Sequence, residues 1–239
     1  WLAVLFAAFT ATASLGIGNM FQINNVAAAV NTILYGYDGQ SSATVNLIVG
    51  LVSATMVAVV ILGGIKRIAN VASKIVPFMC VIYILAGLFI LLKNASAFPP
   101  GLGLIFQYAF TAPESVAGGL LGGVIRSGVA RGLFSNEAGL GSAAMAHGAA
   151  RTREPIRQGM VAMLGPFIDT IVVCTITALV IICTGAYETI TVKGKLTCAA
   201  FDMGIPGAGK VVFLAIILFA FSTLISWSYY GDRAVDYLF

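Results

Sequence analysis

Residues 211–231 read VVFLAIILFAFSTLISWSYYG and contain no Asp, Glu, Lys or Arg. A helix of about 20 apolar residues is long enough to cross the hydrocarbon core of a bilayer. Further charge-free runs occur along the chain, at residues 1–37, 39–65, 75–92 and 170–187. Only 9% of the 239 residues are charged, whereas an ordinary soluble domain is about 25% charged. The sequence therefore predicts an all-α polytopic membrane protein.

The apolar pattern predicts six spans in a single transmembrane domain over residues 1–239. The spans cover about residues 1–34, 44–65, 75–92, 114–150, 158–184 and 210–230. Residues 94–113 contain a Pro-Pro-Gly sequence near their start, which favours a loop with an interfacial helix. The chain is apolar from Trp1 and stops soon after the last span, so we expect it to be an internal piece of a longer protein.

Basic residues are unevenly divided between the two sets of linkers. The linkers after spans two and four and the tail after span six hold Lys66, Arg67, Lys74, Arg151, Arg153, Arg157 and Arg233. The intervening loops hold Lys93, Lys193, Lys195 and Lys210. Because short loops rich in Lys and Arg stay in the cytoplasm, the first span should begin on the cytoplasmic side. We expect a multi-pass protein of the cell membrane, namely of a bacterial plasma membrane.

The fourth span combines glycine with charge. Residues 115–142 contain eight glycines, and each glycine in a helix interior costs about 1 kcal/mol relative to alanine. The stretch also contains Arg126, Arg131 and Glu137, and charges at membrane depth usually face a cavity or a partner. Broken helices of this kind are typical of transporter binding sites. We expect an interruption around Gly132–Asn136; a continuous helix in which Arg131 and Glu137 neutralise each other is the alternative.

Polar residues in two other spans are further candidates. Asn19 and Gln22 in span one are three residues apart, and Thr223 and Trp227 in span six are four apart. Residues at these spacings share a helical face. Each pair is therefore either part of a binding site or a source of interhelical hydrogen bonds.

Two titratable residues stand alone in the sequence. Asp169 in span five has no sequence-local cation, so it is an ion or proton site or it pairs with Arg126 or Arg131. His147 lies beyond the glycine-rich region, where a structural hydrogen bond is favoured over a proton relay.

Several strings resemble the alanine or glycine:cation symporter family. They are GLFSNEAGLGS at 132–142, RQGMVAMLG at 157–165, FIDT at 167–170, LGGIKR at 62–67, GIGN at 16–19 and WSYYG at 227–231. The strings are ordered and extend from residue 16 to residue 231. The resemblance implies a LeuT-like fold of two inverted five-helix repeats, in which the six spans are helices three to eight.

The resemblance also implies an activity, namely secondary active uptake of alanine or glycine coupled to Na⁺ by alternating access. A proton-coupled transporter of similar amino acids is the alternative. The expected partners are a small neutral amino acid, Na⁺ and membrane lipid, without nucleic acid. No enzyme activity and no cofactor are expected beyond Na⁺ as the coupling ion, and the four cysteines form no CxxC metal pair. An intramembrane hydrolase using Ser142 with His147 or Asp169, or a passive channel, is disfavoured by the absence of their motifs.

By resemblance, the substrate contacts are Gln22, Phe134, Thr223 and Trp227. A small zwitterion needs hydrogen-bonding partners without a net counter-charge, and two aromatic side chains can limit its size.

By the same resemblance, Ser222 and Thr223 provide hard oxygen ligands for the cation, so that Thr223 belongs to either site or to both. Since the substrate is neutral, the charged side chains of the glycine-rich region and of span five are assigned to gating or structural ion pairs. These are Arg126, Arg131, Glu137 and Asp169.

Overall fold

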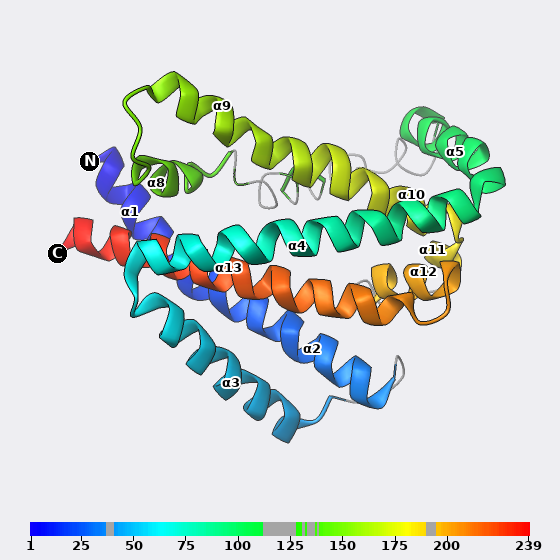
Figure 1. The fold of residues 1–239 in the computed structure, drawn as a ribbon, viewed down its shortest axis with the longest axis horizontal. Coiled ribbons are helices and arrows are strands. Elements are labelled where there is room, and N and C mark those ends of the chain that lie inside the picture. The colour runs from blue at the N-terminus through cyan, green and yellow to red at the C-terminus, as the bar shows by residue number, and fades with distance from the viewer. Residues whose placement is uncertain (37–40, 112–127, 131, 133–136, 138, 190–194) are drawn as a thin grey trace.

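The computed structural model is all-helical in the part of the chain it describes (Figure 1), which is residues 1–36, 41–111, 128–130, 132, 137, 139–189 and 195–239. Five of the described helices are long and apolar enough to cross a membrane: Leu2–Tyr35, Ala43–Ile61, Gly64–Lys93, Pro155–Cys183 and Ala208–Leu238. The predicted polytopic, all-α architecture is confirmed. The predicted fourth span lies largely outside the described residues.

Two of the spans contain a π-helical segment. In the first span, η1 (Ser14–Met20) joins α1 (Leu2–Ala13) to α2 (Phe21–Tyr35). In the fifth predicted span, η3 (Phe167–Cys174) joins α9 (Pro155–Pro166) to α10 (Thr175–Cys183). Such segments are rare and occur frequently at functional sites.

α13 (Ala208–Leu238) is the central helix of the bundle (Figure 1). It packs against α1, η1 and α2 of the first span, and also against α3 (Ala43–Ile61), α4 (Gly64–Lys93) and α12 (Leu196–Gly204). The start of α1 lies beside the end of α13, so the two spans run antiparallel. The burial of α13 follows from this position, since half of its most apolar stretch is buried inside the protein.

Two apolar clusters fix the position of α13. The larger contains Tyr83 and Ile90 of α4, Val180 of α10, Phe201 of α12 and Val212 of α13. The smaller joins the other half of α13 to α3 and α4, and it contains Val60, Ile68, Phe221 and Ile225. Because both clusters include α13, this helix is held along most of its length.

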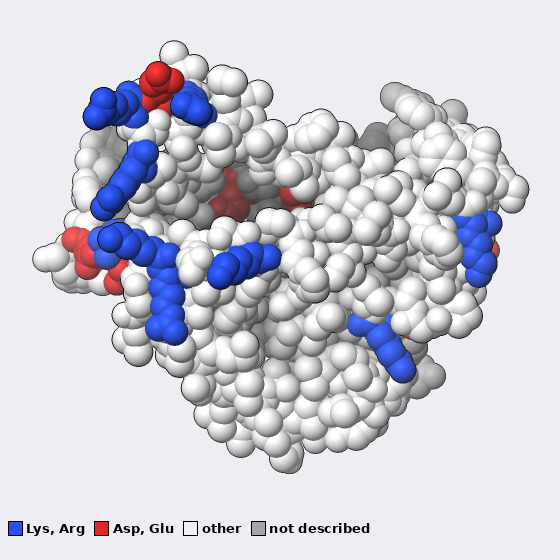
Figure 2. Space-filling view, viewed as in Figure 1, with Lys and Arg blue, Asp and Glu red and all other residues white. Residues whose placement is uncertain are grey.

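The basic side chains gather at one end of the bundle. Figure 2 shows most of them at the end where both termini lie, over the α3–α4 turn and the linker between α8 (Ala143–Gly148) and α9. Lys93, Lys195 and Lys210 lie toward the opposite end, where α4 ends and α12 and α13 begin. The described basic residues therefore divide between the two ends as the sequence predicts.

The connection after α4 contains the predicted short helix. A single 3₁₀ turn (Ala95–Ala97) leads into α5 (Phe98–Thr111), which lies at the end of the bundle away from the termini (Figure 1). A further short helix, α11 (Ala186–Thr189), lies at the same end. Both short helices therefore lie at the end of the bundle opposite the termini.

Cys198 of α12 is expected to be chemically inert in the folded protein. Its side chain is fully buried, and burial together with the nearby Asp202 carboxylate raises its pKa to about 12. Because only the thiolate attacks a maleimide, we expect no labelling of Cys198 near neutral pH until the protein is unfolded. Mass spectrometry of the protein and its Cys198→Ala variant, labelled before and after unfolding, measures this. Labelling of Cys198 in the folded protein would contradict the prediction.

Candidate functional site

The first span and α13 approach each other closely at Gly18. A Cβ atom at Gly18 would lie 2.6 Å from the Cβ of Trp227, well inside van der Waals contact. Likewise, a Cβ at Gly231 would lie 2.5 Å from the Ser14 Oγ. Small residues therefore allow the Trp227 side chain to lie directly against the backbone of η1. These positions were not among the predicted site residues, although Ser14 and Gly18 have the small-xxx-small spacing that signals such a crossing.

Trp227 lies on a face of α13 that also carries Thr223 and Tyr230. The three residues have i, i+4 and i+7 spacing in an uninterrupted helix, so they line one stripe of its surface. Trp227 is only 4% exposed, and its ring packs edge-on against Tyr230 with 5.7 Å between ring centroids. The predicted shared face of Thr223 and Trp227 is present in the structure.

Gln22 lies on the face of α2 that is directed at α13. It is half-buried, and Asn25 and Ala29, three and seven residues further along the same helix, line a cavity with Phe213 and Ile216 of α13. That cavity has a volume of about 300 Å³. Residues at these spacings share a helical face, so the Gln22 amide belongs to the α2–α13 interface.

Gln22 and Thr223 lie at the same level of this interface. Gln22 is four residues after Gly18, and Thr223 is four residues before Trp227. Because the two spans are antiparallel and Gly18 contacts Trp227, the adjacent turns bring Gln22 and Thr223 to facing positions. Three of the four predicted substrate residues are thus on facing surfaces, and the fourth, Phe134, lies outside the described residues.

Ser222 and Thr223 both direct their hydroxyl protons to the same backbone carbonyl. Ser222 Oγ donates to the Phe219 carbonyl at 2.8 Å, and Thr223 Oγ1 donates to it at 2.9 Å. A hydroxyl that donates its proton in this way keeps acceptor lone pairs on its oxygen. Oxygen lone pairs are what a hard cation requires, so the two side chains are compatible with the predicted cation site.

Glu137 meets this face of α13 from a non-helical stretch that precedes α8. Ser142 Oγ donates a hydrogen bond of 2.9 Å to Glu137 Oε2, and the Trp227 indole and Tyr230 hydroxyl face the same carboxyl. Acidic side chains are visible inside the hollow between α9 and α4 in Figure 2. Glu137 therefore connects this stretch to α13, a partnership that the sequence did not predict.

The described part of the fourth predicted span is interrupted. Residues 128–130 and 132 are helical, residues 137 and 139–142 are not, and α8 follows. The predicted break at Gly132–Asn136 falls mostly outside the described residues, but the chain is helical at Gly132 itself. Arg126 and Arg131 also lie outside the described residues, so their predicted ion pairs with Glu137 and Asp169 remain predictions.

Asp169 and His147 have distinct surroundings. Asp169 is half-buried in η3 and lies near Cys80 of α4, which places it on the inner side of its span. The Gln158 amide Nε2 lies 2.8 Å from His147 Nδ1 and so joins α9 to α8. The predicted structural hydrogen bond of His147 is confirmed. The Ser142 hydroxyl donates to Glu137 rather than to His147, so the described residues do not form the hydrolytic set considered above.

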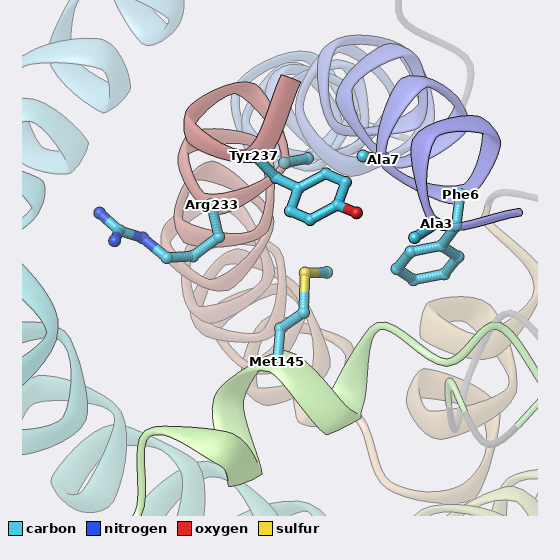
Figure 3. Close-up of a pocket in the computed structure, with 7 residues that line it drawn as sticks. Ala3, Phe6, Ala7, Met145, Arg233 and Tyr237 are labelled. Atoms are coloured by element: carbon cyan, nitrogen blue, oxygen red, sulfur yellow. The ribbon is translucent and has the colours of Figure 1, made fainter. Parts of the chain in front are cut away.

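A second cavity, of about 260 Å³, separates α8 from α1 and α13 at the end of the bundle that holds the termini. Its lining residues are mostly apolar: Ala3, Phe6, Ala7, Met145, Arg233, Ala234 and Tyr237. Figure 3 shows Met145 of α8 pointing between α1 and α13, with the Arg233 guanidinium directed away. The cavity offers few hydrogen-bonding partners for a zwitterion. It lies at the packing interface of α8 with the first span and α13.

Apolar spans, π-helical irregularities and a polar, largely uncharged α2–α13 interface define a polytopic membrane protein with the features of a solute carrier. The sequence profile of the sodium:alanine symporter family matches residues 1–239. The chain belongs to the sodium:alanine symporter family, which is a family of membrane transporters and not of enzymes.

Three relatives illustrate this membership. The chain is 48% identical to the sodium/alanine symporter AgcS of Methanococcus maripaludis, over 99% of the chain and 51% of that protein. It is 39% identical to the amino-acid carrier protein AlsT of Bacillus subtilis, over 100% of the chain and 49% of that protein. It is 38% identical to the probable sodium/glutamine symporter GlnT of Bacillus subtilis, over 100% and 48%. The chain thus spans about half the length of the curated relatives it matches.

Proposed function

We propose that the protein containing this chain takes up a small neutral amino acid, alanine or glycine, together with Na⁺. Family membership supports symport, and the name of the Methanococcus relative supports this substrate and ion. The structural observation that carries the proposal is the interface between the first span and α13, where Trp227 lies on Gly18 of η1 and the adjacent turns carry Gln22 and Thr223. This combination offers hydrogen bonds and an aromatic wall without a fixed charge.

The chemistry of a zwitterion suits these groups. The Gln22 amide can donate to the carboxylate or accept from the ammonium group, and the Thr223 hydroxyl oxygen can accept a further bond. Trp227, fixed on one side by Gly18, forms a wall that disfavours larger side chains. Phe134 is the proposed second aromatic wall of the same site.

Na⁺ is assigned to the hydroxyl oxygens of Ser222 and Thr223. Their protons are both held by the Phe219 carbonyl, which leaves the oxygens free to act as ligands. The two residues are consecutive, so they point about 100° apart around α13. Thr223 then faces the substrate side, and Ser222 extends the ligand set away from it.

The proposed fold is a LeuT-like inverted repeat that works by alternating access within a single transmembrane domain. The two π-helical segments support it, because they place irregular backbone inside spans one and five, next to Gln22 and at Asp169. Arg126, Arg131, Glu137 and Asp169 are proposed as gating or structural charges rather than substrate contacts.

The test uses the full-length protein in proteoliposomes with radiolabelled alanine. An inward Na⁺ gradient should drive accumulation, and an imposed proton gradient alone should not. If only a proton gradient drives accumulation, the coupling ion is H⁺ and not Na⁺. One relative, from Bacillus sp., is named a sodium/proton-dependent alanine carrier protein. Uptake of glutamine in preference to alanine would contradict the assigned substrate.

Thr223→Val is expected to reduce both the apparent Na⁺ affinity and the rate of uptake. Valine has the same shape but no oxygen ligand, and loss of one ligand or hydrogen bond to a charged group costs about 1.5–3 kcal/mol, or roughly 10- to 100-fold. The measurement is initial alanine uptake as a function of Na⁺ concentration. Thr223→Ser, which keeps the hydroxyl, is the matched control and should retain Na⁺ dependence. An unchanged half-saturating Na⁺ concentration in Thr223→Val would remove this residue from the cation site.

A further inference from the structure

We propose that Glu137 is a positioning residue that fixes the orientation of Trp227 and thereby sets the size of the amino acid that the site accepts. This inference rests on the proposed function, since it gives Trp227 a role as a wall of the substrate site. It assigns to Glu137 a role distinct from an ion pair with Arg131. The argument depends on what surrounds the Trp227 indole and on what holds Glu137.

Trp227 is restrained on two sides by α13 and the first span. Its Cβ and the adjoining part of the indole lie against the backbone at Gly18, and its ring packs edge-on against Tyr230. These contacts limit how far the side chain can move toward α1 or along α13. They do not fix the indole N–H, because apolar packing has no directional preference for that group.

Glu137 supplies the directional contact. Its carboxyl faces both the Trp227 indole and the Tyr230 hydroxyl. A carboxyl oxygen can accept a hydrogen bond from a donor such as an indole N–H. A carboxyl at this position therefore favours one rotation of the indole over others, because a hydrogen bond has a preferred direction.

The Glu137 carboxyl is itself held in place. Ser142, which is only 1% exposed, donates to Oε2 at 2.9 Å. The Glu137 backbone has φ 56°, a left-handed conformation that costs a non-glycine residue about 1–3 kcal/mol and persists only where the surroundings enforce it. Because both its backbone and its side chain are restrained, the carboxyl has a fixed position and can restrict the orientation of the Trp227 indole.

The stretch that carries Glu137 is also anchored beyond Ser142. Gly141 has φ 78°, and a Cβ there would lie 3.4 Å from the Phe6 ring of α1. Met145 of α8 then points into the apolar cavity between α1 and α13 (Figure 3). Glu137 thus lies between α13 and α8, and α8 itself packs against α1 and α13. Its position depends on the same helices that form the substrate site.

The first experiment measures selectivity in the full-length protein. In Glu137→Ala, the indole loses its directional partner, so Trp227 should yield to larger side chains. We expect the excess of glutamine over alanine that halves alanine uptake to fall about fivefold, as for the loss of one neutral hydrogen bond. Glu154→Gln, a change to an exposed carboxyl in the α8–α9 linker, is the control and should leave this ratio unchanged. An unchanged ratio in Glu137→Ala would overturn the proposal.

A double-mutant cycle separates positioning from a general loss of structure. If Glu137 acts through Trp227, the effects of Glu137→Ala and Trp227→Phe on the glutamine/alanine ratio should be strongly non-additive, because phenylalanine has no N–H to orient. Additive effects would show that Glu137 acts elsewhere and would overturn the proposal. Ser142→Ala provides a milder variant, which should shift the ratio in the same direction by a smaller factor.

A spectroscopic readout makes the inference independent of transport. The difference in tryptophan emission between the protein and its Trp227→Phe variant isolates Trp227. Removing the carboxyl that faces the indole should shift this emission to shorter wavelength in Glu137→Ala, and Glu154→Gln should not change it. If the parent protein transports no amino acid, the proposed function fails while this measurement still tests the contact. An unshifted spectrum would overturn the proposal even in a protein that transports alanine.

Discussion

Gly18→Ala is expected to lower alanine uptake by about tenfold or more, because its methyl group would overlap the Trp227 side chain. The added Cβ would lie 2.6 Å from the Cβ of Trp227, and no flexible group lies between them. Either the first span must move away from α13 or the indole must leave its place. Overpacking of this kind destabilises a protein by about 1–3 kcal/mol. Here it would displace Trp227, the residue that bounds the proposed substrate site.

Gly16→Ala is the matched control for this substitution. Gly16 lies in the same π-helical segment, but a Cβ there would meet nothing within 4 Å. The change in intrinsic helix propensity is the same in both variants, so only the contact with α13 differs. Uptake in Gly16→Ala should remain close to that of the parent protein. Equal losses in both variants would show that the flexibility of η1, and not the crossing with Trp227, limits transport.

Gln22→Leu is expected to reduce alanine uptake about 10- to 100-fold, mainly through a higher KM. The substitution keeps the size of the side chain but removes its hydrogen-bonding groups, and an unmatched charged group of a bound substrate costs about 1.5–3 kcal/mol. The measurement is the KM and maximal rate of Na⁺-driven alanine uptake. A lower maximal rate with an unchanged KM would instead assign Gln22 to the conformational cycle.

Asn24→Leu provides the comparison for Gln22. Asn24 lies two residues further along α2, but it borders a cavity shared with Asn46 and Gly50 of α3. The same loss of an amide therefore occurs on the other side of the helix. We expect a small effect on KM, and a loss as large as that of Gln22→Leu would indicate that α2 tolerates no substitution on either face.

Much of the fold could be predicted because the membrane imposes it. Charge-free runs of about 20 residues leave few alternatives to a spanning helix, and five of the six predicted spans have counterparts among the described helices. The shared face of Thr223 and Trp227 could also be predicted, since it follows from the period of a regular helix. The spacing from Asn19 singled out Gln22 as a candidate, and the resemblance to the family gave it the role of a substrate contact.

The remaining features depend on contacts between distant parts of the chain. The π-helical segments arise from backbone bonding that no residue type prescribes, and Ser14–Met20 has an unremarkable composition. The role of Gly18 becomes clear only when Trp227 lies against it. The sequence favours a pairing of Glu137 with Arg131, because the two residues are only six positions apart. The contacts of Glu137 with Trp227 and Tyr230 come from a helix about 90 residues later, which pattern analysis cannot pair with it.

The length of α13 has a mechanical consequence. Its 31 residues extend roughly 46 Å at about 1.5 Å per residue, whereas the hydrocarbon core is about 30 Å thick. Trp227 lies 19 residues from the start of the helix, or roughly 28 Å. Rotation of α13 as a rigid helix by roughly 10° about its crossing with Gly18 would therefore displace the start of the helix by roughly 5 Å. A small rotation of α13 at this crossing would therefore produce a much larger displacement at that end of the helix.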